Sequence, residues 1–273
     1  MPERPDIDLT KPSAARVYDY YLGGAHNFAV DREMAEQAIR MWPELPLIMQ
    51  ANRAFLRRAV QHCVERGATQ FLDLGSGIPT AGNVHEIARA ADPGARVVYV
   101  DNDPIAVTYS RTILGDDRQT AVVHEDLRRP ADVLSSPQVR DLLDLSRPVV
   151  VMMVAVLHFV PGDATGVVAA YRDAVPPGSL LVVSHATHDG QDRQADEHTD
   201  LYRRRTATPM TMRTKTEVEE LFTGFDLVEP GVVHLPLWRP ASPEDVGEHP
   251  ERVAGLAAVG VKRRTNGPVP TFE

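Results

Sequence analysis

The chain has 273 residues, of which 43% are hydrophobic and 25% charged, and this balance predicts a packed core in one large domain or two small ones. A formal net charge of −9 argues against a nucleic-acid substrate, which normally calls for a basic surface. The apolar runs are too short to span a membrane, and the polar start at residues 1–5 is unlike a signal peptide, so we expect a cytoplasmic protein without a membrane partner. We also expect no disulfide, because Cys63 is the single cysteine, and no metal site, because no metal-ligand spacing is present.

The pattern of the first 66 residues predicts an arm followed by helices. Residues 1–11 are polar and contain prolines. Helical periodicity follows in 13–22, 31–41 and 47–66. The first of these helices is expected to begin at Ser13 and to stop at the pair Gly23-Gly24. We expect residues 1–66 to form an arm and helical cap, and 67–273 to form the core of one compact unit.

The core predicts an α/β fold, because apolar strand-like runs alternate with helical patterns. The expected strands are 69–74, 96–101, 119–124, 148–154, 179–185, 225–235 and 253–262. The expected helices are 80–91, 104–114, 131–144, 163–175 and 214–222, with Pro137 splitting the third. Residues 188–209 form a polar stretch for which no helix is predicted. The pattern favours a doubly wound, mostly parallel sheet of seven strands with helices on both faces.

The most informative segment follows the first predicted strand, where Asp73 leads into a loop with Gly75, Ser76 and Gly77. Glycines at a strand-to-helix turn let the backbone come close to a ligand. The second predicted strand ends in Asp101, where a carboxylate can accept hydrogen bonds from two ribose hydroxyls. These residues predict a nucleoside site at the carboxyl ends of a parallel sheet.

The loop also indicates which nucleoside is bound. A dinucleotide loop would carry a third glycine where this chain has Thr80, and no phosphate-loop motif is present. Asp73 would repel a pyrophosphate, but it suits a ligand that carries an ammonium and a sulfonium. S-adenosylmethionine is therefore the predicted cofactor, and a nicotinamide-dependent oxidoreductase is an alternative that Thr80 disfavours.

Several segments together resemble a known family. They are residues 12–24 (PSAARVYDYYLGG), 26–28, 51–56, 71–77, 98–104, 154–160 and 184–187. The chain resembles class I S-adenosylmethionine-dependent methyltransferases, and more narrowly an actinobacterial S-adenosyl methyltransferase family long catalogued as a domain of unknown function. The resemblance covers about residues 10–262 and is most specific in the first segment. It implies a Rossmann-like core and this cofactor, and it leaves the methyl acceptor undefined.

Four further residues are expected around the cofactor. Asn102 would lie beside the adenine ring. In this fold an acidic residue after the third strand commonly meets the adenine amino group, and the next backbone amide meets a ring nitrogen, which suits Asp126 and Leu127. The alternative for Asp126 is a solvated loop carboxylate. Val154, at the end of the fourth strand, completes this set.

The amino-terminal segment supplies a possible lid over the cofactor, with Arg16, Tyr18, Tyr21 and Gly23 as its candidate residues. A guanidinium can pair with the methionine carboxylate through two hydrogen bonds. Tyr18 and Tyr21 are three residues apart and so share a helix face. The alternative is a helix packed on the sheet with its tyrosine hydroxyls reaching water.

His158 is the candidate catalytic residue, because it follows the fourth strand where a methyl acceptor should approach. It would act as a general base or orient the acceptor, and the alternative is a half-buried structural histidine. His185 and His188 are second candidates with the same ambiguity. The sequence thus predicts a methyltransferase for a small-molecule acceptor. A non-catalytic protein that senses S-adenosylmethionine is the other possibility, and no oligomeric state follows from the sequence.

Overall fold

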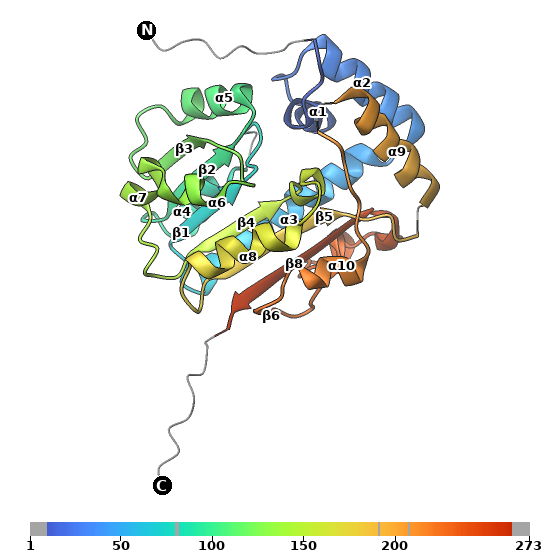
Figure 1. Ribbon diagram of the computed structural model, residues 1–273. Coiled ribbons are helices and arrows are strands. Elements are labelled where there is room, and N and C mark those ends of the chain that lie inside the picture. The colour runs from blue at the N-terminus through green and yellow to red at the C-terminus, as the bar shows by residue number, and fades with distance from the viewer. Residues whose placement is uncertain (1–9, 80–81, 191, 207, 264–273) are drawn as a thin grey trace.

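The computed structural model describes residues 10–79, 82–190, 192–206 and 208–263. Its centre is a sheet of eight strands in the order β3-β2-β1-β4-β5-β8-β6, with β7 pairing with β8 (Figure 1). The first five strands are parallel, and β8 runs antiparallel to its neighbours. The strands are β1 (Gln70–Leu74), β2 (Arg96–Asp101), β3 (Thr120–His124), β4 (Val150–Val154), β5 (Leu180–Ala186), β6 (Phe225–Leu227), β7 (Val233–His234) and β8 (Gly255–Lys262).

The strand count corrects one prediction. The predicted strand 225–235 is two strands, β6 and β7, which pair with different stretches of β8. A turn separates them, in which the Gly231 amide donates to the Val228 carbonyl at 2.9 Å and Gly231 has a φ of +81°. Pro230 lies in this turn and has no N–H for a ladder. The other six predicted strands are confirmed to within two residues.

Helices flank the sheet, and most were predicted. They are α1 (Ala14–Tyr21), α2 (Ala29–Met41), α3 (Leu45–Glu65), α4 (Val84–Ala91), α5 (Pro104–Leu114), α6 (Pro130–Ser135), α7 (Pro137–Leu142), α8 (Ala164–Ala174), α9 (Asp192–Arg205) and α10 (Lys215–Glu220). The split at Pro137 is confirmed, since α6 ends and α7 begins there. The predicted helix start at Thr80 lies outside the described residues. The polar stretch 188–209, for which no helix was predicted, contains α9.

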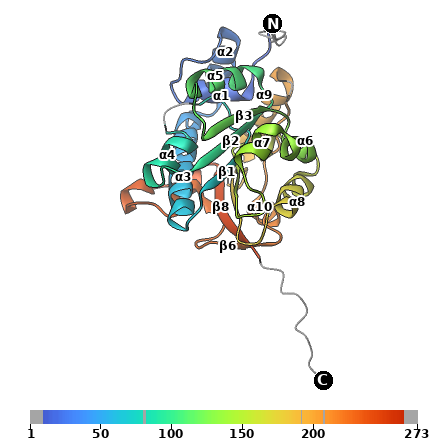
Figure 2. The same cartoon turned by 90° about the vertical axis from the view of Figure 1, so that its left-hand side faces the viewer.

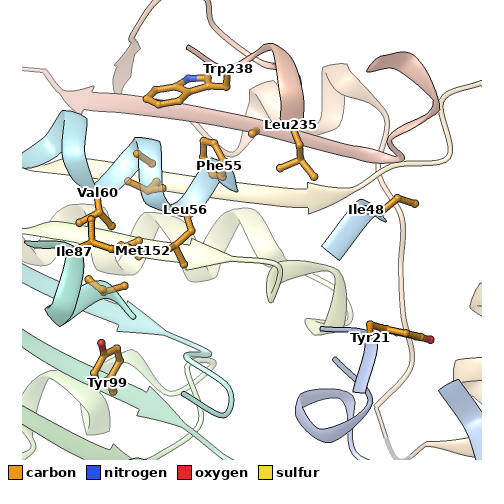
Figure 3. Close-up of a cluster of buried hydrophobic side chains, with 14 of the residues drawn as sticks. Tyr21, Ile48, Phe55, Leu56, Val60, Ile87, Tyr99, Met152, Leu235 and Trp238 are labelled. Carbon is orange, nitrogen blue, oxygen red and sulfur yellow. The ribbon is translucent and has the colours of Figure 1, made fainter. Parts of the chain in front are cut away.

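Two apolar layers hold the sheet, because successive side chains of a strand point to opposite faces. Phe71 and Met152 belong to the layer that α3 and α4 cover, and Figure 3 shows Met152 near Leu56 of α3. Leu72 and Met153 belong to the other layer, which α7, α8 and α10 cover. Figure 2 shows the sheet between α3 and α4 on one side and α7 and α8 on the other. Helices on both faces are therefore confirmed.

A buried ion pair joins α1 to α2. Arg16 Nε donates to Asp31 Oδ2 at 2.9 Å, and the two side chains are 4% and 0% exposed. The backbone amides of Ser13 and Phe28 also donate to the Asp31 carboxylate, at 3.0 and 2.9 Å. Asp31 therefore joins the start of α1 to the start of α2. Figure 1 shows this segment grouped with α9.

No helix in the described part of the chain combines the length and apolarity that a bilayer crossing needs. The same residues contain no group of three or more histidine, cysteine or acidic side chains that could hold a metal ion. Cys63 is buried in α3, and burial raises the pKa of its thiol to about 12. Its place among core residues follows from the apolar stripe on which it lies.

We expect Asp31→Ala to lower the free energy of unfolding by about 3–5 kcal/mol, because it leaves Arg16 buried without its carboxylate. Chemical denaturation measures the change. Asp132→Ala is the control, since Asp132 pairs with Arg129 at the surface and its loss should cost about 1 kcal/mol or less. An equal loss of unfolding free energy in the two variants would show that the buried ion pair contributes no more than the surface pair.

Candidate active site

A cavity of about 580 Å³ lies at the carboxyl ends of the parallel strands. Its lining comes from the loops after β1 to β5, from α1 and α3, and from α9. The sheet order places β1 beside β4, where the direction of crossover reverses, and ligands of open α/β sheets bind at such a point. The volume lies in the range of small-molecule pockets.

The loop after β1 has two positions that favour glycine. φ is +75° at Gly75 and +66° at Gly77. A Cβ on Gly75 would lie 2.2 Å from Val156 Cγ2, so a side chain there would collide with the loop after β4. A Cβ on Gly77 would meet no atom of the described residues within 4 Å. The backbone of Gly77 therefore borders open space in which a ligand fits.

Asp101 holds this loop in place. Its Oδ2 accepts from the Gly77 amide at 2.7 Å, and its Oδ1 accepts from the Asp103 amide at 2.8 Å. Burial raises the pKa of the carboxyl to about 6, although both amides oppose the rise. Asp101 lines the cavity as predicted. It also orders the glycine loop, which the sequence analysis did not anticipate.

Asp73 is buried at the end of β1, and it is 5% exposed. The positive charge of Arg53 acts on its carboxylate from α3. Burial raises the pKa of Asp73 to about 7 against the opposing effect of Arg53, and Asp101 adds to the rise. A buried carboxylate of this kind gains most from a positively charged ligand group.

The β2 and β3 loops form the other side of this half of the cavity, where Asn102, Asp126 and Leu127 all line it. Arg128 Nε donates to both Asp126 oxygens, at 3.0 and 2.9 Å, and this hydrogen bonding lowers the pKa of Asp126. The Tyr171 hydroxyl donates to the Leu127 carbonyl at 2.9 Å. The loop is thus fixed from α8, which holds Leu127 at the cavity.

The amino-terminal segment lies against α5, beside the cavity. The Ser13 hydroxyl donates to Asp103 Oδ2. The His26 and Tyr109 rings meet at 4.4 Å between centroids in an edge-to-face contact. Lys11 to Arg16, with Tyr18 and Tyr21, line the cavity, so the segment predicted as a lid does border it.

The glycine pair has a structural explanation. Gly23 follows α1 with a φ of +76° and does not line the cavity. A Cβ on Gly24 would lie 2.0 Å from Asp19 Oδ1, so the buried Asp19 carboxylate requires glycine there. Asp19 Oδ2 in turn accepts from the His26 amide at 2.8 Å and from Asn27 Nδ2 at 2.9 Å. Gly23 and Gly24 thus shape the turn that returns the chain to α2.

Arg16 and Tyr18 already have partners within the protein. Arg16 uses Nε for Asp31 and one terminal nitrogen for the Lys11 carbonyl, at 2.7 Å. Asn52 Nδ2 donates to the Tyr18 hydroxyl at 2.8 Å. Burial raises the pKa of Tyr18 against the effect of this hydrogen bond. A ligand carboxylate that pairs with Arg16, as predicted, would therefore share the Arg16 guanidinium with Asp31.

Comparison with known proteins decides the family. The sequence model of the S-adenosyl methyltransferase family matches residues 1–263. The chain belongs to the S-adenosyl methyltransferase family. It is 42% identical to a candidate methyltransferase from Thermobifida fusca YX, with a TM-score of 0.89 over 95% of this chain and 98% of that one. It is 41% identical to a DUF574 family protein from Streptomyces avermitilis MA-4680, with a TM-score of 0.89 over 93% and 99%.

More distant structures share the fold. A candidate methyltransferase of Haloferax volcanii, solved with its activator, is 16% identical and has a TM-score of 0.52 over 86% of this chain and 98% of that one. Comparison with curated proteins gives no match. The family and its structures support an S-adenosylmethionine-dependent methyltransferase with a Rossmann-like fold.

The methyltransferase has residues that fit this cofactor. The Asp73 carboxylate is buried and suits an ammonium or sulfonium group. The Ser76 hydroxyl is buried without a hydrogen-bond partner among the described residues, and an unsatisfied buried hydroxyl at a ligand loop indicates a missing partner. The backbone of Gly77 borders open space. Every predicted cofactor-binding residue except Gly23 lines the cavity.

His158 lies in the short 3-10 turn η1 (Leu157–Phe159), and it also lines the cavity of the methyltransferase. Its Nδ1 accepts from the Ala186 amide at 3.4 Å. Burial lowers the pKa of His158 well below its usual value, and the charges of His185, His198 and Arg213 add to this effect. The ring is therefore neutral at pH 7, with Nδ1 as acceptor and its proton on Nε2. This tautomer donates a hydrogen bond, which favours orienting an acceptor over removing its proton.

The two second candidates differ in position. His185 lines the cavity, and its ring centroid lies 5.4 Å from that of His158. Arg213 Nη1 donates to His185 Nε2 at 2.7 Å, so His185 Nδ1 carries the proton and donates to the Ala186 carbonyl at 2.7 Å. Burial lowers the pKa of His185 to about 4. His188 does not line the cavity.

Several lining residues were not identified from the sequence. Trp42, Arg53, His198 and Tyr202 all line the cavity. His198 and Tyr202 come from α9, the helix that was not predicted. The sequence feature that could have revealed this helix is the spacing of four side chains that lie on one of its faces and are buried: Ala195, His198, Leu201 and Tyr202.

We expect the affinity for S-adenosylhomocysteine to fall about fourfold between pH 8 and pH 6.5. The reason is that the ligand ammonium binds the ionised form of Asp73, and the pKa of about 7 makes that form scarce at the lower pH. Calorimetry at both pH values measures the change. His158, His185 and His198 have lowered pKa values and stay neutral over this range.

Asp73→Asn tests the assignment. It should bind the ligand more weakly at pH 8, and its affinity should vary little down to pH 6.5. The same substitution should raise the midpoint of thermal unfolding of the ligand-free protein at pH 8, because it removes a buried charge. A pH profile unchanged by Asp73→Asn would show that another group is responsible.

Proposed function

We propose that the enzyme transfers a methyl group from S-adenosylmethionine to a small-molecule acceptor bound in the same cavity. The observation that carries the proposal is the continuity of that cavity, which runs from the glycine loop and Asp101 to His158 and α9. The net charge of −9 gives no support to a nucleic-acid acceptor. The lone, buried Cys63 supports action in the reducing cytoplasm.

The roles of the residues follow from their positions. Asp73 would compensate positive charge on the methionine half, and the Asp101 carboxylate would meet the ribose. Asn102, Asp126 and the Leu127 amide would surround the adenine. Bound S-adenosylmethionine supplies an electrophilic methyl group: the acceptor lone pair forms the new bond, and sulfur keeps the electron pair of the bond that breaks.

The remaining work of the protein is alignment and exclusion of water. The neutral His158 would donate from Nε2 to the acceptor and so fix its orientation. The acceptor proton would then leave to solvent or to a group on the acceptor itself. The aromatic rings beyond His158 would keep water away from the line between sulfur and acceptor.

S-adenosylmethionine and S-adenosylhomocysteine should bind with one-to-one stoichiometry, and NAD should not bind. The physical reason is the buried Asp73, which disfavours a pyrophosphate. Isothermal calorimetry with each compound measures this. Binding of NAD without binding of S-adenosylhomocysteine would overturn the cofactor assignment for this chain and favour the oxidoreductase alternative.

We further propose that residues 12–28 close over the bound cofactor. Two contacts support closure, from Ser13 to Asp103 and from His26 to Tyr109, since both join the segment to α5 beside the cavity. Amide hydrogen exchange in α1 should slow at least several-fold when S-adenosylhomocysteine saturates the protein, because opening would require loss of the ligand. Amides of α7, which lie outside the cavity, are the control. Equal slowing in α1 and α7 would indicate global stabilisation instead of closure.

A further inference from the structure

The cavity extends beyond His158 into a part with a different chemical character, which we term the aromatic chamber. It is formed by side chains from α1, the α2–α3 turn, η1, α9 and the segment after α9. Its defining residues are Tyr21, Trp42, Phe159, His198, Tyr202 and Met210. All six are buried or half-buried. They come from separate segments that the fold gathers at the ends of β4 and β5.

Four of these side chains form a continuous series of ring contacts. The Trp42 and His198 centroids lie 5.8 Å apart with planes at 89°, and those of His198 and Tyr202 lie 4.9 Å apart at 65°. The Tyr202 and Phe159 centroids lie 5.5 Å apart at 33°. Ring walls of this kind favour a flat ligand that can pack edge-to-face or in an offset stack. The thioether of Met210 adds an adaptable apolar surface.

Three chamber side chains have buried polar atoms without a hydrogen-bond partner among the described residues. These atoms are the Tyr21 hydroxyl, Trp42 Nε1 and both ring nitrogens of His198. The three residues are 5%, 1% and 3% exposed. Burial lowers the pKa of His198 to about 4, so the neutral ring offers one donor and one acceptor. Unpaired groups of this sort are rare in native cores, and a ligand in the chamber can supply the partner.

Among the residues that the structure describes, none that defines the chamber carries an ionised side chain. The acidic and basic residues that line the cavity belong to its other half, at residues 11–16, at Arg53 and at the ends of β1, β2 and β3. The three histidines of the acceptor side have lowered pKa values and are neutral at pH 7. A charged ligand would lose its hydration here without gaining a counter-charge.

We propose that the methyl acceptor is an uncharged, planar aromatic or heteroaromatic molecule with a hydroxyl or carbonyl oxygen, bound with its ring in the aromatic chamber. The inference rests on the proposed methyl transfer, since it names the substrate class of that reaction. The oxygen accepts from Trp42 Nε1 or from the protonated nitrogen of His198. The ring packs between the Trp42 and Phe159 sides of the chamber.

A matched series of probes separates the effects of the aromatic ring, of charge and of molecular shape on binding. Naphthol is uncharged and aromatic, naphthoate carries a negative charge, naphthylmethylamine carries a positive charge, and decahydronaphthol keeps the hydroxyl without the aromatic ring. Each is titrated by ligand-observed NMR at pH 7, with and without saturating S-adenosylhomocysteine. Naphthol should bind at least tenfold more tightly than the other three. Equal or tighter binding of a charged or saturated probe would overturn the proposal.

His198→Phe tests the location, because it keeps an aromatic ring and removes both unpartnered nitrogens. It should weaken naphthol at least fivefold, leave the affinity for S-adenosylhomocysteine within twofold, and leave the midpoint of thermal unfolding unchanged or higher. Trp42→Phe should behave in the same direction. His62→Phe is the control, since His62 is also a buried histidine with an unpartnered nitrogen, but it packs against Trp238 outside the cavity.

The outcomes distinguish the two proposals. Naphthol affinity that His198→Phe and Trp42→Phe leave unchanged would place the probe elsewhere and overturn the chamber assignment. Failure of S-adenosylhomocysteine to bind would overturn the methyl-transfer proposal. The titrations without that ligand would then still decide whether the chamber takes a neutral aromatic molecule.

Discussion

The arrangement of the site depends on a carboxylate that the fold buries in the wall of the cavity. Asp73 stands at the end of β1, and burial raises its pKa to about 7 even with Arg53 nearby. An ionised group in this position is unfavourable until a ligand brings positive charge. The Ser76 hydroxyl lines the same cavity, and Arg53 brings a positive charge to it. A cationic ligand group would act in the same direction as Arg53 and favour the ionised form of Asp73.

A second constraint links the base of the cavity to its amino-terminal cover. The Ser184 hydroxyl donates to Asn52 Oδ1 at 2.5 Å, and Asn52 Nδ2 donates to the Tyr18 hydroxyl at 2.8 Å. The Ala155 amide donates to the same Ser184 oxygen at 2.9 Å, and Ala155 has a φ of +54°, which is unusual for a residue with a Cβ. Buried hydrogen bonds therefore connect β5, α3, α1 and the strained end of β4. A displacement of α1 would therefore alter the hydrogen bonds that position the loop after β4.

The parts of the fold that follow a simple period were predictable from the sequence. The buried strands read as apolar runs, and Pro137 divided two helices because proline ends one and begins another. The run 225–235 was predicted as one strand because its apolar residues continue across a turn. Pro230 and Gly231 interrupt the pairing with β8 at this turn and divide the run into β6 and β7. The sequence could also group the cavity residues that lie near Asp73 and Asp101, for a similar reason. These residues follow strand ends, so Asp73 and Asp101 could be placed together before the structure was known.

The aromatic chamber, the proposed acceptor site, could not be placed in this way, because no single sequence period contains it. Its rings come from α1, the turn before α3, η1 and α9, and only the tertiary fold brings them together. Helix α9 was not predicted because its apolar periodicity is weak. Its exposed face carries ion pairs such as Arg193–Glu197, and its buried face includes a histidine. Under the proposed acceptor assignment, substitutions at Trp42, Phe159 or His198 would change the acceptor without altering the glycine loop or the two strand-end carboxylates. A fold organised like this can keep one cofactor while its acceptor varies.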